Sequence, residues 1–162
     1  MDLVIGYYAG ESDAIADLFT RSVHELAAAH YTAAEREAWA PRPVDLERWR
    51  WRCELERPFV CRIDGAIAGF LELDPDGHVD CHYVHPAHAR RGVARALLRH
   101  AIDVARGAGL ARMCVEASHG IRPLYERHGF ACLGANRVER RGVVLQNWRM
   151  ERTLAAAADP AP

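Results

Sequence analysis

The stretch V-H-P-A-H-A-R-R-G-V-A-R-A-L-L, which runs from Val84 to Leu98, decides the fold because an extended run turns into a helix within it. Pro86 and Gly92 bracket the turn, and apolar residues recur at helical spacing after it. A helix that begins directly after such a turn leaves several backbone N–H groups unpaired at the positive end of its dipole. Arg90 and Arg91 add positive charge at the same place. The stretch therefore predicts a site for an anion such as pyrophosphate.

The segments on both sides of this stretch alternate between strand-like and helical patterns, and Ser12 is expected to be the N-cap of the first helix. The Asp64-Gly65 pair favours a tight turn between two strands. The order of elements predicts a single α/β or α+β domain with a mixed sheet. Strands are expected at Leu3–Tyr7, Phe59–Ile63, Ala66–Leu73, His78–Val84, Leu110–Ala117, Phe130–Gly134 and Val143–Thr153. Helices are expected from Ser12 to Leu26, in pieces between Tyr31 and Arg52, from Val93 to about Gly107 and from about His119 to His128.

The composition is that of one globular domain. The 162 residues are 50% hydrophobic and 27% charged, so the chain can bury a core of ordinary size. We expect a domain over residues 1–154 and a flexible alanine- and proline-rich tail over 155–162. No apolar run is long enough for a membrane span, no signal peptide opens the chain and the five cysteines form no C-x-x-C pair. These features predict a cytoplasmic protein with neither disulfides nor a cysteine metal site.

The charges nearly cancel, since 21 basic residues face 22 acidic ones, and this balance does not favour a nucleic-acid or membrane partner. All the basic residues are arginine. The absence of lysine excludes Schiff-base chemistry, pyridoxal phosphate anchoring and the lysine of a P-loop. Between Ala87 and Arg106, five arginines are opposed only by Asp103, so the positive field is local.

Two motifs resemble those of the GCN5-related N-acetyltransferase (GNAT) family, and the resemblance covers about residues 59–152. Ala89, Gly92 and Ala94 follow the spacing of that family's acetyl-CoA loop, Gln/Arg-x-x-Gly-x-Gly/Ala, with Ala89 in the Gln/Arg position. Downstream, the segment from Ser118 to Phe130 is similar to Asn-x-x-x-x-x-Phe/Leu-Tyr-x-x-x-Gly-Phe, with Ser118 in place of asparagine. Further upstream, the residues Ser22-Val23-His24, Tyr31 and Ala38-Trp39-Ala40-Pro41 resemble a branch of small bacterial members.

The resemblance implies a GNAT fold with a mixed, mostly antiparallel seven-stranded sheet and about four flanking helices. It also implies direct transfer of an acetyl group from acetyl-CoA to a primary amine of a small molecule or peptide, without a metal. Tyr125 falls on the tyrosine that protonates the departing thiolate in the family, and a backbone N–H near Tyr83 to His85 would polarise the thioester carbonyl. The residues expected to bind the cofactor are Tyr83, Val84, Ala89, Arg90, Arg91, Gly92, Val93, Ala94, Arg95, Ser118 and Tyr125.

A substrate ammonium must lose a proton before its nitrogen can attack, so a base is also required. Strand alternation predicts that His78, Asp80 and His82 share a face with Val84. Asp80 is the first candidate for the base and His82 the second. Glu72 and Glu116, on flanking strands, are alternatives.

Other patterns have plainer interpretations. His82, His85 and His88 recur every third residue, but a strand end followed by Pro86 would scatter their rings, so we do not expect a zinc site. Trp39, Trp49 and Trp51 could line an acceptor pocket, although core packing suits at least two of them. One alternative function stays open, a non-catalytic acyl-CoA sensor that has kept the cofactor site. The oligomeric state is also open, since the final strands could pair between two subunits of a homodimer.

Overall fold

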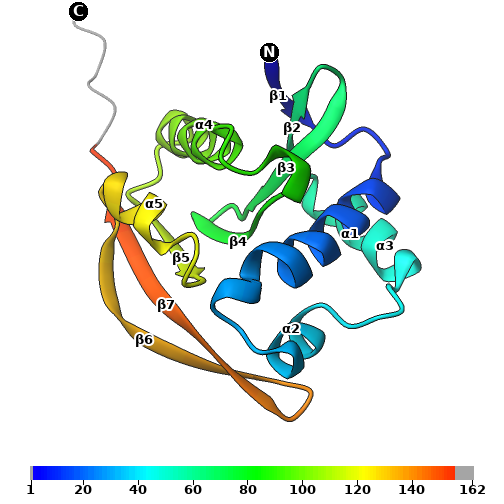
Figure 1. The fold of residues 1–162 in the computed structure, drawn as a ribbon. Helices are drawn as coiled ribbons and strands as arrows, with labels where there is room; N and C mark the ends of the chain where they lie inside the picture. The colour runs from blue at the N-terminus through cyan, green and yellow to red at the C-terminus, as the bar shows by residue number, and fades with distance from the viewer. Residues whose placement is uncertain (1, 156–162) are drawn as a thin grey trace, which may run out of the picture.

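Seven strands form one mixed sheet in the computed structural model, which describes residues 2–155 (Figure 1). The strands are β1 (Leu3–Tyr7), β2 (Phe59–Ile63), β3 (Ala66–Leu73), β4 (His78–Val84), β5 (Arg112–Ala117), β6 (Ala131–Arg140) and β7 (Val143–Thr153). They are arranged in the order β1-β2-β3-β4-β5-β7-β6. Every neighbouring pair is antiparallel except β4 and β5, which run parallel. The expected α/β class and the mostly antiparallel seven-stranded sheet are confirmed.

Helices cover both faces of this sheet. The described residues contain five α-helices rather than about four: α1 (Ser12–Arg21), α2 (Ala33–Trp39), α3 (Leu46–Glu56), α4 (Val93–Gly107) and α5 (Arg122–Arg127). A π-helical turn, η1 (Ser22–Leu26), and a 3-10 turn, η2 (Ala27–Ala29), continue α1, and a second 3-10 turn, η3 (Pro86–His88), follows β4. Helix α4 lies on one face of the sheet, whereas α1 and α3 lie on the other (Figure 1).

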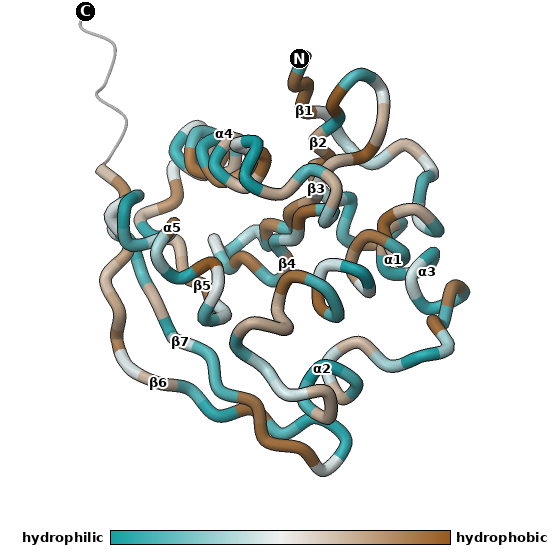
Figure 2. Tube along the Cα trace, in the orientation of Figure 1, coloured by the Kyte–Doolittle hydropathy of each residue, from teal (hydrophilic) through white to brown (hydrophobic). Residues whose placement is uncertain are grey.

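Two apolar clusters hold these layers together. On one face, the apolar stripe of α4, which includes Leu97, Leu98 and Ile102, packs on the strands. On the other face, Ile15 and Leu18 of α1 pack on the opposite side of the central strands. The central strands accordingly consist mostly of hydrophobic residues between the two helical layers (Figure 2). Their two buried faces fix the direction of every side chain near the strand ends.

Gly69 lets the beginning of α4 approach β3 closely. A Cβ atom at Gly69 would lie 2.6 Å from Cγ1 of Val93 and 2.9 Å from the carbonyl oxygen of Tyr83. Only a residue without a side chain permits this contact, because both neighbours are buried or fixed in a strand. Gly69 therefore sets the position of the α4 N-terminus relative to the end of β4.

Two local expectations were wrong. Ser12 is the first residue of α1 rather than its N-cap, and Glu11 occupies the cap position. The strand expected to end at Gly134 continues to Arg140, because β6 pairs with β7 along its whole length. The Arg141-Gly142 turn that joins them has positive φ at both residues, as a tight hairpin turn requires.

The expected tail lies outside the described residues from position 156 onward. Within the described part of the chain, no helix combines the length and the apolar character that crossing a membrane would need.

Candidate active site

The parallel strands β4 and β5 separate in the middle of the sheet. They are paired only at His78–Cys114 and Val79–Val115, whereas β4 stays paired with β3 as far as Val84. From residue 80 to 84, one side of β4 therefore presents backbone groups to an opening instead of to a neighbouring strand. Such an internal sheet edge can pair with an extended ligand that carries amide groups.

The N-terminus of α4 lies next to this opening. Gly92 is its N-cap, with φ +83°, and no side chain caps the helix. A Cβ atom at Gly92 would meet nothing within 4 Å, so glycine is required there by the backbone conformation and not by crowding. Arg90, which also has positive φ (61°), stands in the same loop. The unpaired N–H groups of the first helical turn and this arginine form a cradle for an anion.

A cavity of about 1040 Å³ joins the opening to this cradle. Its lining brings together nine of the eleven residues expected at the cofactor site. Of the other two, Arg91 lies at an adjoining hollow and Tyr125 is fully buried behind the wall. The nine lining residues are Tyr83, Val84, Ala89, Arg90, Gly92, Val93, Ala94, Arg95 and Ser118.

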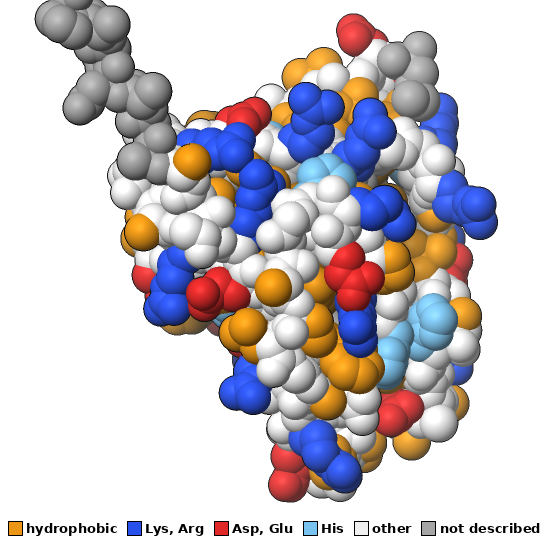
Figure 3. All heavy atoms as spheres, turned by 90° about the vertical axis from the view of Figure 1, so that its left-hand side faces the viewer, with side chains coloured by type: hydrophobic (Ala, Val, Ile, Leu, Met, Phe, Trp, Pro, Cys, Tyr) orange, Lys and Arg blue, Asp and Glu red, His pale blue; other side chains and the backbone are white. Residues whose placement is uncertain are grey.

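Six arginines line the cavity, of which only Arg90 and Arg95 were expected. Arg99 and Arg106 follow Arg95 at helical spacing on α4, a signal that the sequence did contain. Arg127 and Arg152 come from α5 and β7, and no local pattern connects them with α4. Seen from the left-hand side of Figure 1, arginine side chains gather at the level of α4 (Figure 3). The positive field predicted for the loop therefore continues along the cavity.

Tyr125 and His82 form a hydrogen-bonded pair beside the opening. His82 lines the cavity, and its Nε2 lies 3.1 Å from the carbonyl oxygen of Ala94. A carbonyl can only accept, so Nε2 carries the hydrogen and Nδ1 accepts from the Tyr125 hydroxyl at 2.9 Å. Burial lowers the pKa of His82 to about 4 and raises the pKa of Tyr125. Both side chains are therefore uncharged at neutral pH.

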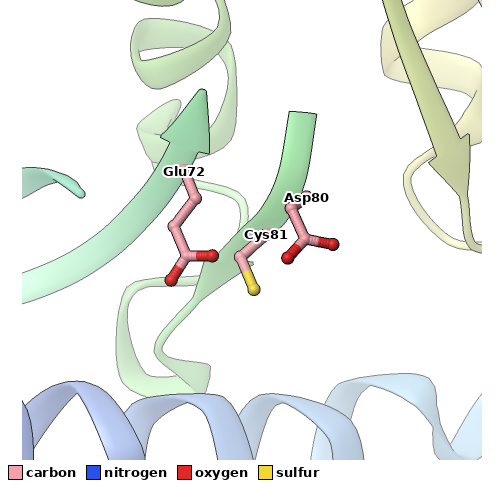
Figure 4. Close-up of side chains that lie close together, drawn as sticks. All are labelled: Glu72, Asp80 and Cys81. Carbon is pink, nitrogen blue, oxygen red and sulfur yellow. The ribbon is translucent and has the colours of Figure 1, made fainter. Parts of the chain in front are cut away.

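The expectation that Asp80 shares a face with His82 and Val84 was wrong. Glu72 of β3 pairs with Cys81, but its neighbour Leu73 pairs with Val79, so Asp80 is the extra residue of a β-bulge. The bulge shifts the alternation by one residue. Asp80 consequently points with Cys81 and Glu72 toward α1, away from α4 (Figure 4).

Asp80 and Glu72 both form salt bridges with one arginine, Arg52. The guanidinium of Arg52 donates to both carboxylates and lies 3.4 Å from the sulfur of Cys81. Glu72, Asp80 and Cys81 have ligand atoms within 4.8 Å of one another, which is a possible metal arrangement, but the guanidinium already supplies their positive charge. Neither carboxylate lines the cavity.

The other candidates for a base or for zinc ligands each contact a different partner. Glu116 lies 2.6 Å from Nε2 of His78, outside the cavity. His85 contacts Arg21, and His88 contacts Arg91. The histidines at positions 82, 85 and 88 therefore do not converge on one point, as a zinc site would require.

Known proteins share both this fold and this sequence pattern. A family model described as an acetyltransferase (GNAT) domain matches residues 27–152. The chain belongs to the GNAT family. GNAT proteins of this kind are N-acetyltransferases, a class of acyltransferase.

Individual proteins are similar to this chain in sequence or in fold. A curated relative, the uncharacterized N-acetyltransferase YafP of Escherichia coli (strain K12), is 31% identical over 144 residues, which cover 89% of this chain and 91% of YafP. A GCN5-related N-acetyltransferase structure from Rhodopseudomonas palustris superimposes with a TM-score of 0.89 at 26% identity, covering 95% of this chain and 97% of that one. The yncA structure from Salmonella typhimurium, which holds acetyl-CoA, has a TM-score of 0.72 at 24% identity and covers 99% of both chains.

Within this GNAT fold, one wall of the cavity is aromatic. Tyr31 and Trp39 line the cavity together with Tyr83 at the end of β4. Of the other two tryptophans between residues 39 and 51, Trp49 packs against Phe19 and Phe70, whereas Trp51 is 69% exposed on α3. Only Trp39 of the three clustered tryptophans therefore reaches the site.

Proposed function

We propose that this protein transfers the acetyl group of acetyl-CoA to a primary amine of a small molecule or peptide by direct attack. The observation that carries the proposal is the open edge of β4 beside the uncapped N-terminus of α4, within one cavity. The pyrophosphate would lie on the N–H groups of residues 90–95, and the amide groups of pantetheine would pair with β4 near Tyr83 and Val84. The thioester would then lie at the opening, beside His82.

The chemistry needs a carbonyl that is polarised and a thiolate that can leave. A free backbone N–H near the end of β4 would stabilise the developing oxyanion; the N–H of His85 is unsuitable, since it already donates to Ala68. The amine nitrogen forms a bond to the carbonyl carbon, and the carbon–sulfur bond then breaks. Tyr125 would give its proton to the departing thiolate.

The Tyr125–His82 pair supports a closed proton cycle. When the Tyr125 hydroxyl turns to the thiolate, Nδ1 of His82 becomes free to take a proton from the amine. It can then return this proton to the Tyr125 oxygen, and the enzyme is restored. His82 lines the cavity, which supports it as the base. Asp80 does not line the cavity, because it points to the other side of the sheet, where it pairs with Arg52.

Two substitutions test the role of the Tyr125–His82 pair. Tyr125→Phe should lower kcat about 10²-fold while leaving the affinity for acetyl-CoA, measured by calorimetry, nearly unchanged. If Tyr125 and His82 act as one unit, adding His82→Gln to Tyr125→Phe should cost little more than either change alone. Full activity of Tyr125→Phe would exclude the acid role.

The cofactor cradle is tested by Gly92→Glu, which places a negative side chain where the pyrophosphate would lie. It should weaken acetyl-CoA binding at least about tenfold, because an anion is repelled from its own site. Gly92→Gln is the matched control, since it imposes the same backbone strain at positive φ with a side chain of the same length but without the charge. Tight acetyl-CoA binding without release of coenzyme A to any amine would instead indicate a non-catalytic sensor.

A further inference from the structure

Charge is distributed unevenly along the cavity. Arginines line the part formed by the loop before α4 and by α4, α5 and β7, and the sole carboxylate among the described lining residues, Asp103, lies among them. Asp103 is about 15 Å along the helix from the α4 N-terminus. The opposite part, which we call the acceptor end, is lined by Ser22, Val23, Leu26, Ala27, Tyr31 and Trp39. No charged side chain is among them.

The aromatic wall at the acceptor end is held in place by hydrogen bonds. The Tyr31 hydroxyl donates to the carbonyl oxygen of Gln146 at 2.7 Å, and Nε1 of Trp39 donates to the Tyr83 hydroxyl at 3.0 Å. The rings of Tyr31 and Trp39 pack edge to face with centroids 5.3 Å apart, and those of Trp39 and Tyr83 with centroids 6.1 Å apart. Because these polar groups bond to the protein, the wall offers an acceptor mainly ring surface.

An alkylammonium would meet two obstacles at such a wall. Entry would remove its charge from water, with no carboxylate at the acceptor end to compensate. It would then have to give its proton to His82, whose pKa of about 4 makes it a weak base. Glu72 and Asp80 cannot help, because Arg52 binds both of them outside the cavity. Cation–π attraction to the rings would offset only part of this cost.

We propose that the acceptor is an aromatic amine whose nitrogen is uncharged at neutral pH. This inference rests on the proposed transferase function and names its substrate class. The ring of the acceptor would pack on Tyr31 and Trp39, with the amino group directed to the opening beside His82. The nitrogen enters without a proton to remove, and it loses one only as it bonds to the carbonyl carbon. A weak base such as His82 suffices for that step.

The test measures binding separately from turnover. Calorimetry with the protein saturated by coenzyme A should detect 4-methylaniline and should show at least about tenfold weaker binding of 4-methylbenzylamine, cyclohexylamine and 1,4-diaminobutane. The benzylamine keeps the ring and restores the charge, so it separates recognition of the ring from exclusion of the ammonium. Equal or tighter binding of the alkylamines would overturn the inference.

The pH dependence of turnover gives a second readout. An alkylamine with a pKa near that of lysine, about 10.4, becomes roughly tenfold more available for each pH unit between about 6 and 8. The kcat/KM for 4-methylaniline should therefore stay nearly level over this range, and a tenfold rise for each unit would count against the inference. If coenzyme A is never released but the arylamine still binds selectively, the transferase function fails while the ligand class stands.

Two variants locate the site. Trp39→Leu should weaken arylamine binding about tenfold, whereas Trp51→Leu, at an exposed position outside the cavity, should not. Ser22→Asp adds a carboxylate to the acceptor end and should shift the preference toward the alkylamines, a gain that misfolding cannot mimic. Unchanged preferences in both cavity variants would place the acceptor elsewhere.

Discussion

His78 lies between two carboxylates at the start of β4, in the first of the two residue pairs that join β4 to β5. Its Nδ1 is 3.1 Å from Asp74 and its Nε2 is 2.6 Å from Glu116. Burial by itself would lower the pKa of His78, but the hydrogen bonds to Glu116 and Asp74 outweigh it and raise the pKa. Protonated His78 can donate to both carboxylates at once and so joins the turn before β4 to β5.

This arrangement predicts a pH-dependent contribution to stability. The raised pKa means that the folded state holds the proton more tightly, so the contribution is complete below the unfolded pKa of about 6.5 and is lost as the pH rises through the folded value. His78→Gln should lower the free energy of unfolding by roughly 1 kcal/mol near pH 6 and by less near pH 9. Urea unfolding measures both values. His30→Gln, at an exposed histidine, is the control, and an equal loss at both pH values would contradict the prediction.

At the scale of elements, the contact between α4 and β3 positions the anion cradle. Gly69→Ala would force a methyl group against Val93 and the backbone of Tyr83, and we expect a loss of about 1–3 kcal/mol in unfolding free energy. Because α4 must shift to accommodate the methyl group, acetyl-CoA affinity should fall as well.

Gly107→Ala is the matched control for this substitution. The position lies in the same helix with nothing within 4 Å of a new Cβ atom, so alanine should stabilise α4 by up to about 1 kcal/mol. Urea unfolding and calorimetry provide the two measurements. A stable Gly69→Ala protein with parent affinity would show that the close approach is not required.

The elements that were predicted correctly have local causes. The Asp64-Gly65 and Arg141-Gly142 turns each contain a glycine, which adopts positive φ without steric cost, and α4 follows from its apolar stripe. The bulge at Asp80 has no such local signal, because it exists only in the register between β3 and β4. An alternation rule applied to β4 alone therefore put Asp80 on the wrong face.

The candidate site also combines parts that have a local sequence signal with parts that depend on tertiary contacts. The cradle around Gly92 could be predicted, since one continuous segment builds it. Trp39 was a candidate for an acceptor pocket, but the aromatic wall as a whole could not be predicted, because Tyr31, Trp39 and Tyr83 come from three separate segments that only the tertiary fold brings into contact. The pairing of Arg52 with Glu72 and Asp80, which removes both carboxylates from consideration, is likewise a contact between α3 and the sheet.

For the whole molecule, ligand binding should stabilise the fold, because the proposed cofactor would occupy a cavity between the two halves of the sheet. At an acetyl-CoA concentration about 100 times the Kd, linkage adds about 2.7 kcal/mol. For a chain of this size, that corresponds to a rise in Tm of roughly 5–11 °C. Differential scanning calorimetry measures the shift. Gly92→Glu, if it weakens binding about tenfold, should reduce the shift by about half, and an unchanged Tm of the parent protein would contradict cofactor binding.

The short pairing between β4 and β5 also has a mechanical meaning. Tension applied across the sheet would be carried there by two residue pairs, whereas β3 and β4 share five pairs and β5 and β7 share six. A sheet under tension separates where the fewest backbone hydrogen bonds join neighbouring strands, so the β4–β5 boundary is the weakest line of the sheet. A ligand hydrogen-bonded to the free edge of β4 would add bonds along this boundary and so stiffen the sheet. The proposed binding site thus coincides with the part of the sheet that resists tension least.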